Sequence, residues 1–182
     1  LRPLSCTRPK LLFPLANQPI LDWTVRALAE SGVDTVILAV NYMAEAIVRH
    51  MGVSKYGVSI IYSREERPLG TGGPIKRAEN IVGREDPFLA LNGDIICEVD
   101  YRAMVEHHAE TGAVATLALI EVERPERFGV VQLDEEGRIV RFIEKPRPET
   151  APSRLVNAGI YVLSPEIFDY IPAGRPVSRE RG

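Results

Sequence analysis

The feature that most constrains the fold is a regular alternation of apolar runs and helical stripes over the first two thirds of the chain. Apolar runs of the kind that form strands buried on both faces lie at 36–40, 58–63, 87–91 and 113–122. Stripes with apolar residues every three or four positions, which predict helices, lie at 20–31, 44–51, 75–82 and 100–111. This alternation predicts right-handed crossovers, and therefore an α/β doubly wound domain with a parallel sheet.

The rhythm changes after residue 122. Three apolar segments, FGVVQLD, RIVRFIEK and LVNAGIYVLS, follow one another without a helical stripe between them. The stretch DEEGR at 134–138 separates the first two and predicts a hairpin turn. This part is expected to extend the same sheet with mixed or antiparallel strands. Residues 172–182 are rich in Pro, Gly and Arg, which predicts an irregular tail.

Composition and charge exclude several classes of partner. The chain has 182 residues and a formal net charge of −3, so no basic field favours nucleic acid. No apolar run approaches the roughly 20 residues of a membrane-spanning helix. Cys6 and Cys97 form neither a metal-ligand pattern nor a disulfide framework, which indicates free thiols in a reducing cytoplasm. His50, His107 and His108 are expected on helix surfaces rather than as metal ligands.

The residues that follow the predicted strands are the first candidates for function, because ligands of an open parallel sheet bind beyond the carboxyl ends of its strands. Asn92, Gly93 and Asp94 follow the run at 87–91. A carboxylate at a strand end suits Mg²⁺, which takes one or two carboxylates together with water and phosphate oxygens. The alternative is that Asp94 only caps a turn.

A glycine-rich loop, PLGTGGPIK at 68–76, joins a predicted strand to a predicted helix. Gly70, Gly72 and Gly73 can expose backbone N–H groups to an anion or to a flat base. The loop lacks the G-K-[ST] ending of a Walker loop, and its glycine spacing differs from the dinucleotide-binding fingerprint. It is therefore either a ligand loop of another kind or a glycine-rich turn without a ligand.

Two further segments carry polar residues at the end of a strand or within one. Glu144 and Lys145 end a strand and are expected to point to opposite faces, so that one of them faces the site. The alternative is an exposed ion pair. Asn157, Ala158 and Gly159 interrupt an apolar strand, which indicates a bulge or a close approach of the backbone to a ligand. These motifs by themselves identify no reaction.

Taken together and in order, the motifs resemble those of the sugar-1-phosphate nucleotidylyltransferases. The opening, LRPLSCTRPKLLFPLANQPIL, is similar to the nucleotide-binding loop of that family from its Leu onward. Later segments look most like the mannose-1-phosphate guanylyltransferases: ILAVNYMAE, EERPLGTGGPI, LNGDIICEVDY, FGVV, EKP, NAGIYV and RPVS. The resemblance covers nearly the whole chain, and the agreement of separate motifs in order is more specific than any one of them.

The resemblance implies a Rossmann-like mixed sheet, mostly parallel and flanked by helices. It also implies transfer of a nucleotidyl group from a nucleoside triphosphate, with GTP the best match, to a sugar 1-phosphate, with mannose 1-phosphate the best match. The products would be GDP-mannose and pyrophosphate, and the cofactor Mg²⁺. Two alternatives stay open: uridylyl or thymidylyl transfer to glucose 1-phosphate, and a non-catalytic regulatory subunit that binds a nucleotide sugar.

The resemblance assigns roles residue by residue. Asp94 is expected to hold Mg²⁺ across the phosphates and Lys10 to neutralise phosphate charge, since such a displacement depends on alignment and charge neutralisation. The residues expected at the nucleotide are Glu65, Gly70, Thr71, Asn92 and Gly93. Those expected at the sugar phosphate are Gly129, Glu144, Lys145 and Asn157.

Glu65 stands where relatives place a side chain that reads the base. A carboxylate at this position can accept hydrogen bonds from guanine N1–H and N2–H₂, a pattern that uracil and thymine do not offer. The hypothesis is that Glu65→Gln weakens the binding of GTP more than that of UTP, and equal losses would contradict it.

The chain departs from the family pattern at both ends. Its first ten residues, LRPLSCTRPK, have the composition of an internal loop and include no Met, and the first strand, loop glycines and loop Arg of the family are not in the sequence. The second Mg²⁺ carboxylate of the family also falls after the last residue. We therefore expect one nucleotidyltransferase domain over 1–182 that binds Mg²⁺ weakly and catalyses little. Relatives often assemble, so a homo-oligomer is compatible with the resemblance.

Overall fold

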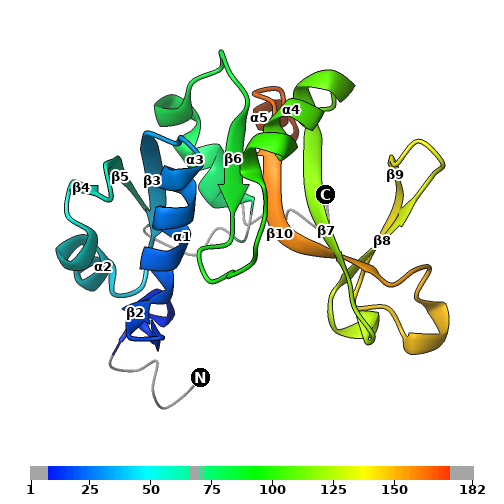
Figure 1. Ribbon diagram of the computed structural model, residues 1–182. Coiled ribbons are helices and arrows are strands. Elements are labelled where there is room, and N and C mark those ends of the chain that lie inside the picture. Colours follow the sequence, from blue (N-terminus) through cyan, green and yellow to red (C-terminus); the bar gives the residue numbers. More distant parts are fainter. Residues whose placement is uncertain (1–7, 66–69, 71, 173–182) are drawn as a thin grey trace.

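The computed structural model describes residues 8–65, 70 and 72–172, and Figure 1 shows their arrangement. Thr71 and the tail after residue 172 lie outside the described residues. The helices are η2 (Lys10–Leu12), α1 (Ile20–Glu30), α2 (Ala44–Met51), α3 (Gly73–Val82), α4 (Tyr101–Thr111), η3 (Pro125–Arg127), η4 (Pro148–Thr150) and α5 (Ile167–Tyr170). The strands are β1 (Pro14–Leu15), β2 (Gln18–Pro19), β3 (Thr35–Val40), β4 (Ser54–Lys55), β5 (Val58–Arg64), β6 (Phe88–Leu91), β7 (Ala115–Glu121), β8 (Gly129–Leu133), β9 (Ile139–Glu144) and β10 (Leu155–Leu163).

The helices α1 to α4 lie where the periodicity predicts them. Asp100 caps α4, because its carboxylate accepts a hydrogen bond of 3.0 Å from the backbone N–H of Ala103. Gly112 ends the same helix in a left-handed conformation, with φ of 60°. The ends of α4 are thus fixed by local side-chain and backbone chemistry.

The strands form two principal sheets. The smaller has the order β3-β5-β4, in which β3 and β5 are parallel from the Thr35–Ser59 pair to the Val40–Arg64 pair. The larger is built around β10, which pairs with β6, β7 and β8, while β9 pairs with β8. In Figure 1 the smaller sheet stands at the left, β6, β10 and β7 in the centre, and β8 and β9 at the right.

The α/β class with mixed sheets flanked by helices is confirmed, but the strand pairing differs from a mostly parallel sheet. Among the described strands, only β3 and β5 pair in parallel. The ladders of β10 with β6, β7 and β8 are all antiparallel. The physical reason is that β10, which comes late in the chain, lies between β6 and β7, so these two strands point the same way without pairing with each other.

The apolar run in β5 is buried on one face rather than on both. Its residues alternate between buried and exposed positions along the strand. Val58 and Ile60 are buried, whereas Ile61 is 38% exposed. A strand in a small three-stranded sheet has one face packed on the core and the other open, which explains the difference from the prediction.

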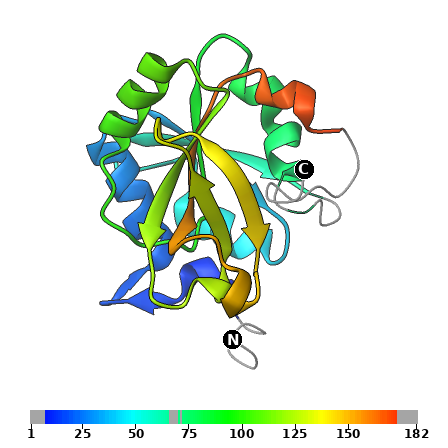
Figure 2. The ribbon, with the colours of Figure 1, turned by 90° about the vertical axis from the view of Figure 1, so that its right-hand side faces the viewer.

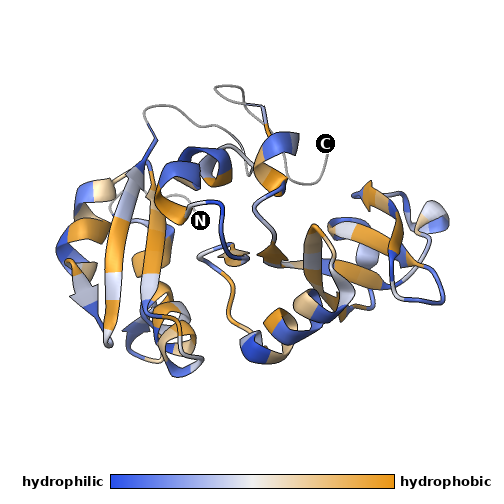
Figure 3. Ribbon diagram, turned by 90° about the horizontal axis from the view of Figure 1, so that it is seen from above, coloured by the Kyte–Doolittle hydropathy of each residue, from blue (hydrophilic) through white to orange (hydrophobic). Residues whose placement is uncertain are grey.

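The main core joins the two sheets through α1. Leu21, Val25 and Leu28 of α1 pack in one buried cluster with residues of α2, β3 and β5 and with Ile160 of β10. Burying each such side chain contributes about 1.5–3 kcal/mol. Figure 3 shows the corresponding pattern, with hydrophobic residues along the strands and in stripes on the helices. The cluster fixes the two sheets relative to one another.

The predicted hairpin turn is present between β8 and β9. The carboxylate of Asp134 accepts hydrogen bonds from the backbone N–H groups of Glu136 and Arg138, and Gly137 adopts a φ of 79°. Figure 2, seen from the right-hand side of Figure 1, shows the β8–β9 hairpin toward the viewer. The hairpin joins the larger sheet through the pairing of Val130 with Val156.

The expectation that all histidines lie on the surface is wrong for His108. This residue is 2% exposed, and its ring nitrogens lie 2.9 Å from the hydroxyl oxygens of Thr116 and Ser164. Burial lowers the pKa of His108 below its ordinary value, which favours the neutral ring. The helical stripe predicted the helix, but its two adjacent histidines, His107 and His108, gave no sign of which one faces the sheet.

No helix in the described part of the chain is both long enough and apolar enough to cross a membrane.

Candidate active site

Lys10 and Asp94, the two residues predicted to be catalytic, form an ion pair. They are 84 positions apart in the sequence. The Lys10 side chain is 51% exposed and that of Asp94 is 33% exposed, so both charged groups are open to solvent. A cation and a carboxylate that face solvent together can contact phosphate oxygens and a metal ion on the same ligand.

Local structure explains how the two residues meet. Lys10 lies in the single turn η2, which begins after Pro9 and is closed by hydrogen bonds from Leu12 and Phe13 to Pro9 and Lys10. Gly93, just before Asp94, lies against the Leu11 side chain, because a Cβ on Gly93 would be 3.3 Å from a Leu11 methyl carbon. The glycine therefore lets η2 pack closely on the segment that carries Asp94.

Asn92 ends up beside the interrupted segment of β10. Its backbone N–H donates to the carbonyl of Gly159 at 3.0 Å, which continues the β6–β10 pairing beyond Leu91. Gly159 has a φ of 77°, and a Cβ there would lie 2.5 Å from Asn92 Nδ2 and 2.7 Å from Ile95 Cδ1. The backbone conformation of this segment favours glycine, and a larger residue would make the Asn92 and Ile95 side chains shift.

Asn157 forms two side-chain hydrogen bonds within the same interrupted segment of β10. Its amide oxygen accepts the backbone N–H of Gly159 at 2.8 Å, and its amide nitrogen donates to the Tyr161 hydroxyl at 2.6 Å. The register between β10 and β7 shifts between Asn157 and Tyr161, so the predicted bulge is present. One amide hydrogen of Asn157 is left for a further acceptor.

Gly129 and Glu144 lie opposite each other in the β8–β9 ladder. A Cβ on Gly129 would be 2.5 Å from Phe142 Cζ and 3.1 Å from Glu144 Oε2. Glycine at this position therefore makes the room in which the Phe142 ring and the Glu144 carboxylate sit. Glu144 is 20% exposed, which leaves its carboxylate partly accessible to a ligand.

The prediction that Glu144 and Lys145 point to opposite faces is wrong. Lys145 adopts a left-handed backbone conformation with φ of 47°, although its N–H still donates to the Phe128 carbonyl at 2.9 Å. This conformation ends the regular alternation of the strand, and the Lys145 ammonium lies 3.5 Å from Glu144 Oε1. The ion-pair alternative is therefore the observed geometry, and Lys145 is 67% exposed.

Glu65 lies in the smaller sheet, directly after β5. Its backbone N–H donates to the Val40 carbonyl at 3.0 Å, and its Oε1 atom is buried without a hydrogen-bond partner. Burial raises the pKa of Glu65 above its ordinary value, while a hydrogen bond from Asn41 and the charge of Arg77 act in the opposite direction. A buried acceptor that lacks a donor is suited to receive one from a ligand.

The glycine-rich loop is only partly described. Gly70 is exposed and has a φ of 75°, a left-handed conformation that favours glycine. Gly72 is the N-cap of α3, and Gly73 and Pro74 are the first two residues of the helix. Thr71, predicted at the nucleotide, lies outside the described residues.

The donor groups at Asp94 fit a Mg²⁺ ion that is bound chiefly through phosphate. Within the described ranges, no three His, Cys, Asp or Glu side chains are grouped so that they could hold a metal ion. Asp94 offers one solvent-open carboxylate, and Mg²⁺ commonly takes one or two carboxylates and fills its other positions with water and phosphate oxygens. The Asp94 carboxylate is thus a suitable ligand for a Mg²⁺ ion whose other ligands are phosphate oxygens and water.

Comparison with known families decides where the chain belongs. The nucleotidyl transferase family model matches residues 1–180. The chain belongs to the nucleotidyl transferase family. It is 41% identical over 184 residues to the mannose-1-phosphate guanylyltransferase catalytic subunit beta of Drosophila melanogaster, and 42% identical over 186 residues to the mannose-1-phosphate guanyltransferase of Yarrowia lipolytica.

These alignments cover 100% of this nucleotidyl transferase chain and 49% and 50% of the two relatives. The chain thus spans about half the length of the curated relatives it matches. Among solved structures, HddC from Yersinia pseudotuberculosis matches with a TM-score of 0.81 and 27% identity, over 95% of this chain and 74% of that one. A putative glucose-1-phosphate thymidylyltransferase from Bacillus anthracis, solved with a sucrose, matches with a TM-score of 0.86 and 26% identity, over 97% and 72%.

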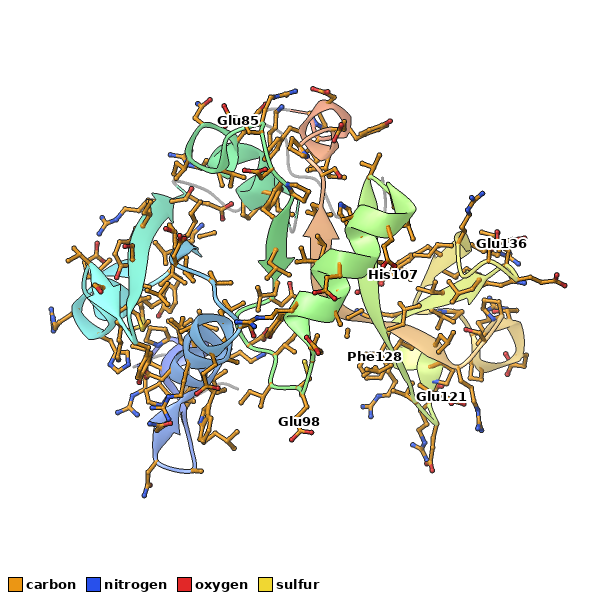
Figure 4. The ribbon with its side chains drawn as sticks, turned by 45° about the horizontal axis from the view of Figure 1, so that its top comes forward. Glu85, Glu98, His107, Glu121, Phe128 and Glu136 are labelled. Atoms are coloured by element: carbon orange, nitrogen blue, oxygen red, sulfur yellow. The ribbon has the colours of Figure 1, made fainter. Side chains whose placement is uncertain are left out.

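One groove in the described part of the chain lies away from these residues. It encloses about 810 Å³ between α4, β7 and the β8–β9 hairpin. Its lining includes His107 on α4 and Glu136 in the hairpin turn, both labelled in Figure 4, and none of the residues predicted at the site. The groove is a space beside a sheet, whereas the predicted residues gather at strand ends, and we take the strand ends as the candidate active site.

Three residues that act on members of the candidate site were not predicted from the sequence. Asn41 and Arg77 act on the Glu65 carboxyl, and Tyr161 holds the amide of Asn157. Asn41 directly follows a predicted strand, so the rule that located Asn92 would have located it too. Arg77 and Tyr161 lie within a helix and a strand, where their patterns are ordinary and give no functional signal.

Proposed function

We propose that this nucleotidyl transferase transfers a guanylyl group from GTP to mannose 1-phosphate, forming GDP-mannose and releasing pyrophosphate. The observation that carries the proposal is the solvent-open ion pair of Lys10 and Asp94. It supplies a cation for phosphate oxygens and a carboxylate for Mg²⁺ in one place. The choice of base and sugar rests on the relatives that are 41% and 42% identical to this chain.

The reaction is a displacement at the α-phosphorus of GTP. A phosphate oxygen of mannose 1-phosphate forms a bond to that phosphorus while the bond to the pyrophosphate oxygen breaks. The attacking oxygen is already ionised, so the step needs alignment and charge neutralisation rather than a general base. Lys10 would neutralise the crowded phosphate oxygens, and Asp94 would hold Mg²⁺, which supplies further positive charge when bound.

The remaining site residues would bind the two substrates. The Glu144 carboxylate would accept hydrogen bonds from sugar hydroxyls, and the exposed Lys145 ammonium beside it would contact the sugar phosphate. Asn92 and Asn157, held together at Gly159, would border the space between sugar and nucleotide. Glu65 would recognise the base. Its buried Oε1 lacks a hydrogen-bond donor, and guanine N1–H or N2–H₂ could donate to it.

The test is a product assay with the protein expressed from its own gene. GTP, UTP and dTTP are each offered with mannose 1-phosphate and with glucose 1-phosphate, and the nucleotide sugars are identified by mass spectrometry. We expect GDP-mannose as the main product. Faster formation of UDP-glucose or dTDP-glucose would overturn the proposed base and sugar. Binding of GDP-mannose without any turnover would favour the regulatory-subunit alternative.

The proposal includes a location and an assembly. An exposed free thiol such as that of Cys97 stays reduced in the cytoplasm, which is where we place the reaction. A homo-oligomer is the assembly that the resemblance favours. Sedimentation of the gene product measures its mass directly, and a monomer at micromolar concentration would contradict that part of the proposal.

A further inference from the structure

The first observation concerns the ends of the parallel strands β3 and β5. Their register pairs Val40 with Arg64, and the Glu65 N–H donates to the Val40 carbonyl at 3.0 Å. Asn41 and Glu65, the next residue of each strand, therefore leave the sheet side by side. The position is the same sheet edge at which ligands of parallel strands bind.

The second observation is an asymmetry in the Glu65 carboxyl group. Asn41 lies beside this carboxyl at the paired strand ends, and as a polar partner it acts to lower the carboxyl's pKa. At the same time Oε1 is buried and has no hydrogen-bond partner. A carboxylate held by a neighbour, with one oxygen left over in a buried position, is oriented before any ligand arrives.

The third observation is that the backbone holds Asn41 in place. It lies between β3, whose ladder fixes Val40, and a turn in which Met43 adopts a left-handed conformation with φ of 56°. The Met43 carbonyl accepts the N–H of Ala46 at 3.0 Å, so this turn leads directly into α2. Asn41 is therefore tied to two elements, although its own side chain is exposed.

We infer that Asn41 is a positioning residue for base recognition, which holds the Glu65 carboxylate so that its free oxygen meets the N1–H and 2-amino donors of a purine. This inference rests on the proposed function for the identity of the base. Arg77, on the exposed surface of α3, adds a positive charge that opposes the rise in pKa that burial causes in the same carboxyl. Asn41 acts through Glu65 and need not touch the base itself.

The experiment compares GDP with IDP, which lacks only the 2-amino group, in calorimetric binding to the 182-residue chain. Asn41→Ala removes the amide, and Asn41→Asp keeps its shape but replaces the donor with a second acceptor. Asn80→Ala is the matched control, because Asn80 is exposed on α3. Glu65→Gln provides the reference for a lost carboxylate.

We expect the unaltered chain and the Asn80→Ala control to bind GDP more tightly than IDP. Both Asn41 variants should reduce the ratio of GDP affinity to IDP affinity by about 5-fold to 100-fold, which is the range for the loss of a directional contact to a base. A merely structural role would weaken both ligands alike and leave the ratio unchanged. An unchanged ratio in the Asn41 variants, with a reduced ratio in Glu65→Gln, overturns this inference and leaves the proposed function standing. No preference for GDP in the unaltered chain also overturns this inference, whereas the product assay decides the proposed function.

Discussion

At the scale of single residues, the candidate site depends on glycines that allow strands to touch. Gly159→Ala is expected to destabilise the fold because its new Cβ would lie 2.5 Å from Asn92 Nδ2. Gly137→Ala is the matched control, since its φ of 79° is close to the 77° of Gly159 while nothing lies within 4 Å of its Cβ. The backbone strain thus cancels, and Gly159→Ala should cost about 2 kcal/mol more in urea unfolding. If both variants lost the same free energy of unfolding, the Asn92 side chain would be able to move away from the new Cβ without strain.

The Lys10–Asp94 pair gives a second prediction at this scale. If these residues neutralise phosphate charge, Lys10→Met and Asp94→Asn should each reduce kcat/KM for nucleotide-sugar formation by about 100-fold or more. Asp86→Asn, at an exposed position, is the control for the loss of one carboxylate. Steady-state kinetics of the gene product measures the effect, and a loss below fivefold in either site variant would remove that residue from the catalytic set.

The candidate residues differ in how far sequence could locate them. Asn92 and Asp94 were found because they follow a recognisable strand, a rule that applies equally to Asn41. Lys10 was assigned through resemblance alone, since no periodicity links it to a residue 84 positions later. The geometry of Lys145 was mispredicted, because strand alternation holds only while φ stays negative and Lys145 turns left-handed.

At the scale of elements, a buried carboxylate joins α1 to α2, to β4 and to the turn after β4. Asp22 of α1 is 2% exposed, and its oxygens lie 2.5 Å from His50 Nε2, 2.6 Å from Lys55 Nζ and 2.8 Å from the Tyr56 hydroxyl. Burial alone would raise the pKa of Asp22, but the hydrogen bonds from Lys55, His50 and Tyr56 lower it below its ordinary value. The ionised form is therefore favoured by the fold.

This arrangement predicts how stability depends on pH. Because the folded pKa lies below the unfolded value of 3.8, the stabilisation by Asp22 is present above that value and is lost as pH falls through the folded pKa. Asp22→Asn should cost about 2 kcal/mol in the free energy of unfolding at pH 7, with a difference from the unaltered chain that shrinks toward pH 3. Urea titrations across this range measure it, and a difference independent of pH would contradict the prediction.

Strand existence was easier to predict than strand pairing. Apolar runs located β3, β5, β6 and β7 from the composition of each segment alone. Their partners depend on β10, whose residues are far away in sequence and carry no local sign of the strands they join. Periodicity describes the face that a strand buries, and pairing is decided by packing across the whole sheet.

At the scale of the whole molecule, β10 is the most enclosed element. Val156, Ile160 and Val162 have no exposed surface, and three other strands donate to or accept from β10. Amide hydrogen exchange should therefore be slowest in β10 and fast in the two-residue strands β1 and β2. Mass spectrometry of peptides from these segments tests this, and exchange in β10 as fast as in β1 would contradict the assignment of β10 to the stable centre.

The central position of β10 also sets an order of assembly during synthesis. β3 and β5 pair within residues 35–64, so their sheet can close before β6, β7 and β10 are translated. β6 and β7 emerge next, but the strand that lies between them spans residues 155–163 and is translated after both. Until it arrives, their edges are open to chaperones and to other nascent chains. The contact of Asn92 with Gly159, on which the candidate site depends, therefore forms only after β10 has been translated.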